Sequence, residues 1–118
     1  MSDSSEMVIF TRSYDLLTWL LPRAEGFPKA QRFVVTQRLT DAALDFQEAL
    51  FDAHVRQGNA RLQQLQAADA HLNKLRLYLR LANEWQWLSL GQYERVSRMV
   101  AELGRLLGGW LKQARGGK

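Results

Sequence analysis

Apolar residues recur at intervals of three and four along most of the chain, which is the spacing of amphipathic helices. Proline occurs only at Pro22 and Pro28, so few breaks are expected. We predict an all-α protein with helices over residues 10–24, 28–56, 60–87 and 90–114. Apolar residues of the last helix alternate steps of three and four, a pattern typical of the seam in an antiparallel up-down four-helix bundle.

The second predicted helix carries two apolar faces. One face, around Phe46, is expected in the core, and an acidic stripe between Asp41 and Asp52 separates it from the other. A single-chain bundle buries one face per helix, so the second face predicts contact with the short first helix or with another subunit. A flank of the third helix is also apolar. The residues that we assign to an oligomer interface are Phe33, Leu44, Phe51, Val55, Leu77 and Leu81.

Glycines interrupt the last predicted helix, although each costs about 1 kcal/mol relative to alanine inside a helix. Gly104 and Gly108 are four residues apart, at the edge of the apolar seam. Small residues at this spacing allow a neighbouring helix backbone to approach closely. We therefore predict close helix packing at these two positions.

Length and composition indicate one globular domain. The chain has 118 residues, and we expect one domain over 1–118 with short flexible tails at both ends. The absence of cysteine excludes disulfides and thiolate metal sites, which fits a reducing cytoplasm. The acidic N-terminal stretch does not resemble a secretory signal, and no apolar run is long enough to span a membrane. We expect a cytoplasmic protein that does not contact membranes.

Basic charge is concentrated in the second half of the chain. The net charge is +4, yet residues 1–73 hold seven Lys and Arg against nine Asp and Glu, while residues 74–118 hold nine against three. The planar guanidinium group of arginine can donate two parallel hydrogen bonds to a phosphate. Such contacts give affinity for nucleic acid that does not depend on its base sequence. Simple solubilisation by charge is the alternative. The candidates for binding nucleic acid or an acidic partner are Lys74, Arg76, Arg80, Arg95, Arg98, Arg105, Lys112 and Arg115.

No pattern of catalysis or metal binding is recognisable. A di-metal site in a helical bundle needs two Glu-x-x-His pairs, and the chain has none. His54 and His71 each follow an aspartate by two residues, a spacing that points to different sides of a helix. We expect no metal, no cofactor and no enzymatic activity. Trp85 and Trp110 fall on apolar stripes and are expected to pack in the core or at an interface, with base stacking as the alternative.

Three segments resemble the accessory variability determinant (Avd) proteins of diversity-generating retroelements. They are "YDLLTWLLPRAEGFPKAQRF" at 14–33, "AADAHLNKLRLYLRLA" at 67–82 and "ELGRLLGGWLK" at 102–112. The resemblance implies a strongly basic four-helix bundle that assembles as a barrel-like homopentamer and binds nucleic acid. It also implies association with the element's reverse transcriptase, which copies a template RNA with errors at adenines, so template RNA or complementary DNA is the expected ligand.

Two other interpretations remain open. The basic face could dock an acidic region of the polymerase, making the protein a pure interaction scaffold. Alternatively, the chain shares a general pattern with small four-helix proteins encoded within ribosomal RNA intervening sequences, which would make it an RNA-associated bundle of that group. The +4 charge is modest for an Avd protein, and the acidic stripe departs from a uniformly positive surface.

Overall fold

The computed structural model of the protein describes residues 3–116, and over this range the chain is helical with no strand. The four α-helices are α1 (Asp3–Ala24), α2 (Gln37–His54), α3 (Gly58–Glu84) and α4 (Leu90–Arg115). Two short elements separate α1 from α2: a 3₁₀ helix, η1 (Lys29–Gln31), and a π-helical segment, η2 (Arg32–Thr36). The predicted all-α class with four helices is confirmed.

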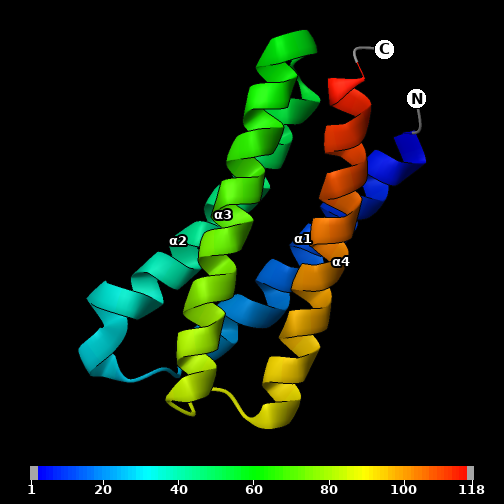
Figure 1. The fold of residues 1–118 in the computed structure, drawn as a ribbon. Helices are drawn as coiled ribbons and strands as arrows, with labels where there is room; N and C mark the ends of the chain where they lie inside the picture. Colours follow the sequence, from blue (N-terminus) through cyan, green and yellow to red (C-terminus); the bar gives the residue numbers. More distant parts are fainter. Residues whose placement is uncertain (1–2, 117–118) are drawn as a thin grey trace.

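The helices form an elongated body of 47 × 25 × 19 Å in which the chain reverses direction at each connection (Figure 1). α2 packs most extensively on α3, and α4 packs on both α3 and α1. In Figure 1, α2 and α4 lie on different sides of α3. Each helix therefore has one side in the centre of the molecule and another in solvent.

The centre is filled by one apolar cluster to which all four helices contribute. Leu65, Leu72 and Leu79 of α3, spaced by seven, are essentially inaccessible to solvent, as is Phe46 of α2. Burying a large apolar side chain is worth about 1.5–3 kcal/mol, so this cluster is the main source of stability. Trp110 is only 6% exposed, which confirms its predicted place in the core.

The first two helices depart from their predicted boundaries. α1 begins at Asp3 rather than near residue 10 and buries Glu6 and Ile9. The second helix does not begin at Pro28: residues 29–36 form the 3₁₀ and π segments instead. β-Branched residues favour α-helix weakly, and three of them stand in a row at 34–36. The parts of the expected tails at 1–2 and 117–118 lie outside the described residues.

α2 ends at His54, two residues before its predicted end. The Arg61 guanidinium donates hydrogen bonds to the carbonyl oxygens of Ala53 and His54, at 3.0 and 3.2 Å. These carbonyls lie in the last turn and at the end of the helix, where acceptors lack partners within the helix. Arg61 thus has a structural role at this turn.

α3 ends at Glu84, three residues before its predicted end, in a Schellman motif. The backbone N–H of Trp87 donates to Ala82 at 2.8 Å and that of Gln86 donates to Asn83 at 3.0 Å. Gln86 takes the left-handed conformation, with φ of 61°. Trp85 is therefore placed at the cap and is 49% exposed, so it does not lie in the core of this chain, and its packing at an interface stays a prediction. Trp87 folds back instead, and its ring lies 5.3 Å from that of Phe27.

α4 begins as predicted, because Ser89 is its N-cap. The Ser89 hydroxyl accepts from the Gln92 backbone N–H at 3.1 Å, and the Gln92 side chain accepts from the Ser89 N–H at 3.0 Å. This capping box satisfies two backbone donors that the helix itself leaves free. Among the described residues, no helix is long and apolar enough to cross a membrane.

Candidate nucleic-acid interface

Two arginines of α3 lie in the groove between α3 and α4. Arg76 and Arg80, one helical turn apart, line a cavity of about 230 Å³ together with Tyr93 and Ser97 of α4. Arg76 Nη1 donates to the Asn73 side-chain oxygen at 2.7 Å, which restrains the guanidinium. The groove therefore combines two positive charges with an aromatic ring and a hydroxyl. Sequence analysis did not assign Tyr93 and Ser97 to this site.

Gly104 leaves the space that Arg76 occupies. A Cβ atom built on Gly104 would lie 2.5 Å from Arg76 Nη2 and 3.7 Å from Leu72 Cδ2. The sequence predicted the close approach of a neighbouring backbone here, but the atoms that face Gly104 belong to side chains of α3. Gly108 differs, because an added Cβ would meet nothing within 4 Å. The close contact predicted at Gly108 is not formed within this chain.

Three further cations form a row on the outer side of α4. Arg98, Arg105 and Lys112 are spaced by seven residues, are exposed, and follow one another at about 10.5 Å along the helix. Exposed small residues, Ala101 and Gly108, stand between them. A ligand can therefore approach the helix closely between the charges. We call Arg76, Arg80, Arg98, Arg105 and Lys112 the basic band.

The other predicted cations lie apart from the basic band. The Arg95 guanidinium lies 5.7 Å from the Trp19 ring centroid, in the groove between α1 and α4, and Arg23 lies 4.2 Å from the same ring. Lys74 is exposed but stands two residues from Arg76, roughly 200° around α3. Arg115 is exposed in the last turn of α4. The structure thus gathers five of the eight predicted residues.

Within residues 3–116, none of the eight predicted cations forms a salt bridge with a carboxylate. The described ion pairs use other residues: Arg12 with Glu102 at 3.2 Å and Asp15 at 3.9 Å, Arg56 with Asp52 at 3.3 Å, and His54 with Glu6 at 3.0 Å. Since the basic band is not neutralised by such pairs, its guanidinium groups can donate charge-assisted hydrogen bonds to phosphate oxygens.

The acidic stripe of α2 lies away from the basic band. Asp41, Asp45, Glu48 and Asp52 are exposed on α2, which packs on a different side of α3 from α4 (Figure 1). The two sets of charge therefore face different directions, and the molecule is electrically asymmetric.

The residues assigned to an oligomer interface lie at the surface of the single chain. Phe33 and Val55 are the most exposed, at 79% and 74%, while Leu81 is half-buried. Leu44 and Leu77 are exposed. Phe51 is partly covered within the chain, because its ring stacks on that of Phe10 of α1 at 5.0 Å. The second apolar face of α2 was predicted to contact either the first helix or another subunit, and this stacking is a contact with the first helix.

The described residues contain no cluster of three or more His, Cys, Asp or Glu that could hold a metal ion. The buried Glu6 carboxylate instead pairs with the half-exposed His54 ring. This pair links the beginning of α1 to the end of α2.

Comparison with known proteins gives a family and a fold. A family model described as bAvd-like matches residues 7–114. Among solved structures, a protein of unknown function from the S23 ribosomal protein family of Bacteroides thetaiotaomicron superposes with a TM-score of 0.83. The two chains are 17% identical, and the match covers 92% of this chain and 98% of the other. No curated protein matches the chain.

Proposed function

The chain belongs to the bAvd-like family, and we propose that it is an accessory nucleic-acid-binding protein of a diversity-generating retroelement. In this role it associates with the reverse transcriptase and with template RNA or complementary DNA, and supports mutagenic reverse transcription without catalysing it. Family membership supports the accessory role, and the basic band supports the contact with nucleic acid.

The observation that carries the proposal is the exposure of the basic band without neutralising carboxylates among the described residues. Phosphate contacts made by such a band are independent of sequence, because they use the backbone of the nucleic acid alone. A protein that must hold a long template while another protein copies it needs this kind of contact. The band follows the groove between α3 and α4 and the outer side of α4.

We propose that the chain folds as an antiparallel up-down bundle. Five copies then assemble into a cytoplasmic homopentamer. The alternating helix directions and the short connections on either side of α3 support the bundle (Figure 1). Exposed apolar side chains such as Leu77 and Val55 support an assembly, since burying them stabilises contact with another copy. Five copies would also multiply the +4 charge of one chain fivefold and add avidity.

A pure protein scaffold is the second candidate, favoured by the extent of exposed apolar surface. In that case the basic band docks an acidic region of the polymerase, and nucleic acid is absent from the complex. The fold likeness to the S23 ribosomal protein family structure is too distant in sequence, at 17% identity, to favour an intervening-sequence role. Recovery of the reverse transcriptase on the tagged protein after nuclease treatment, with no RNA retained, supports the scaffold.

The test is the salt dependence of binding to a fluorescein-labelled single-stranded RNA. We expect the logarithm of the association constant to fall linearly with the logarithm of salt concentration between about 50 and about 200 mM. The slope measures the number of phosphate contacts. Absence of binding at low salt, or an affinity indifferent to salt, contradicts the proposal.

A further inference from the structure

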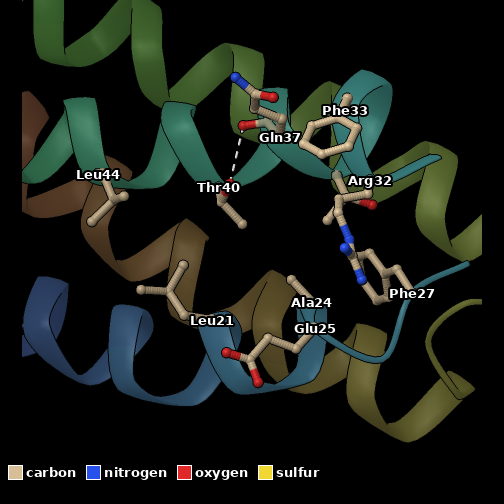
Figure 2. Close-up of a pocket in the computed structure, with 10 residues that line it drawn as sticks. Leu21, Ala24, Glu25, Phe27, Arg32, Phe33, Gln37, Thr40 and Leu44 are labelled. Carbon is tan, nitrogen blue, oxygen red and sulfur yellow. Dashed lines mark hydrogen bonds between the residues drawn. The ribbon is translucent and has the colours of Figure 1, made fainter. Parts of the chain in front are cut away.

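A cavity of about 680 Å³ lies between the end of α1 and the start of α2, away from the basic band. Its volume is within the range of about 300–1,000 Å³ that small-ligand pockets occupy. Figure 2 shows Phe27, Phe33 and Arg32 together at one end of the cavity, with Leu21 and Leu44 at the other. The cavity thus has an aromatic and cationic end and an aliphatic end that also carries the Glu25 carboxylate.

The aromatic end is held in place by packing on one side only. Phe27 is 6% exposed, and its ring packs on Trp87, which packs on Trp85 at 5.2 Å between centroids. Phe33 has no comparable support and is 79% exposed. One ring is therefore a fixed wall, and the other stands at the surface, where a ligand can cover it.

One polar group of the cavity lining lacks a hydrogen-bond partner in the described part of the chain, whereas the Thr40 hydroxyl donates to the Gln37 carbonyl oxygen at 3.0 Å (Figure 2). Thr36 is part of the lining, and its Oγ1 atom is buried without a hydrogen-bond partner among the described residues. Arg32, Phe33 and Thr36 all belong to the π-helical segment η2, a rare geometry that is frequent at functional sites. Two charged residues line the cavity: Arg32 at the aromatic end, and Glu25, which Figure 2 shows on the side of Leu21 and Ala24.

The nature of the lining decides among possible occupants. An apolar side chain would leave the Thr36 hydroxyl unpaired and would cover the Arg32 guanidinium, which costs free energy. A free phosphate would use Arg32 but not the rings. A nucleobase has a flat apolar face for the rings and polar edges for the hydroxyl, and the phosphate attached to it can pair with Arg32.

We propose that this cavity binds a nucleobase from a single-stranded nucleic acid. The proposal rests on the proposed function, because it assumes that the protein binds nucleic acid, and it adds a site that recognises unpaired bases. In a duplex, neighbouring base pairs cover the faces of each base, so only unpaired nucleotides can place a base in the cavity. The basic band, in contrast, accepts single strands and duplexes alike.

The experiment compares a 20-nucleotide single-stranded RNA with a hairpin duplex of the same composition, using Phe33→Ala. We expect binding of the single strand to weaken about 5- to 150-fold, the loss of one stacked base, with hairpin binding unchanged. Tyr14→Ala is the matched control, because Tyr14 is an aromatic residue of α1 with 63% exposure that does not line the cavity. This control should bind both RNAs like the unsubstituted protein.

Two further measurements separate the explanations. Adenosine monophosphate added to the ¹⁵N-labelled protein should shift the amide signals of residues 24–40, and Thr36→Val, which keeps the shape but removes the hydroxyl, should reduce these shifts. Equal single-strand affinity for Phe33→Ala and the unsubstituted protein overturns the nucleobase site while leaving the proposed function intact. A fall in sedimentation mass for Phe33→Ala without a change in affinity identifies the cavity as a contact between copies. If neither RNA binds the unsubstituted protein, both proposals fail.

Discussion

Arg76 of α3 occupies the space above Gly104 of α4, so that its Nη2 atom lies 2.5 Å from the position of a Cβ at residue 104. The absence of one side chain on α4 therefore sets the position of a guanidinium from the neighbouring helix. Because the obstructing atom is the end of a flexible side chain, a substitution at Gly104 displaces the arginine rather than the helix.

Gly104→Ala should weaken RNA binding without lowering stability. Alanine gains up to about 1 kcal/mol in helix propensity, while Arg76 is displaced from the groove and its phosphate contact is lost or weakened. We expect RNA affinity to fall by up to about tenfold, the worth of one charge-assisted hydrogen bond. Gly109→Ala is the control, since its Cβ also meets open space: it should stabilise the protein and leave affinity unchanged. Equal affinities of the two variants would show that the position of Arg76 is irrelevant to binding.

The double substitution Arg98→Gln and Arg105→Gln should reduce the salt dependence of single-stranded RNA binding. Each phosphate contact contributes about 0.7 to the slope of log affinity against log salt, so the loss of two lowers it by about 1.4. Arg56→Gln, in the connection between α2 and α3 and paired with Asp52, is the control and should leave the slope unchanged. The slopes come from fluorescence anisotropy titrations at several salt concentrations. An unchanged slope in the double variant means that these arginines face no phosphate.

Gln86→Gly should stabilise the protein, because glycine adopts the left-handed conformation of residue 86 without steric cost. We expect a gain of about 1 kcal/mol and a higher melting temperature by circular dichroism. The same substitution at Gln63, exposed inside α3, should destabilise by about 1 kcal/mol instead. A melting temperature that falls for both variants would contradict the Schellman geometry.

Phe46→Ala should lower the free energy of unfolding by about 3–5 kcal/mol, as expected for a fully buried phenylalanine. Phe33→Ala should change it by no more than about 0.5 kcal/mol, because this ring is 79% exposed. Urea denaturation gives both values. The comparison also establishes that the Phe33 variant is folded in RNA-binding experiments. A large loss for Phe33→Ala would mean that its ring is buried in solution.

Val55→Asp should disrupt an assembly of several copies, because it places a charge on an exposed apolar position assigned to the interface. Sedimentation should show the mass falling toward the 13.6 kDa of one chain. Leu90→Asp is the control: Leu90 is similarly exposed at 69% but lies in the first turn of α4, where a carboxylate is favourable. An unsubstituted protein that sediments as a single chain would contradict the oligomer itself.

Periodicity predicted the parts of the fold that depend on a repeated apolar pattern. The spacing of Leu65, Leu72 and Leu79 placed α3 correctly, and Ser89 marked the start of α4 because an N-cap acts through its own side chain. The ends of α2 and α3 depend on interactions between distant residues or on unusual backbone conformations. Nothing in the sequence near His54 indicates that the Arg61 side chain donates a hydrogen bond to the His54 carbonyl oxygen. Glutamine is also not a residue from which a left-handed conformation at position 86 would be predicted.

The candidate site was predictable to a similar degree. Helical spacing placed Arg98, Arg105 and Lys112 on one row, because a seven-residue interval depends only on the period of the helix. It did not indicate that Arg95 would turn toward Trp19, or that Arg76 would occupy the space at Gly104, since both depend on how neighbouring helices are placed. The cavity beside η2 could not be inferred, because a π-helical segment has no recognised sequence pattern.

The π-helical segment η2 also sets how far the residues before it are rotated about the helix axis relative to α2. Each residue turns an α-helix by about 100°, so deleting one residue between 32 and 36 to restore regular α-helix would rotate the preceding segment by that angle. Phe33 and Arg32 would then be carried off the mouth of the cavity while the core face of α2 kept its place. A single-codon deletion here would therefore change the surface around the cavity, while the buried residues of α2 would stay in the core.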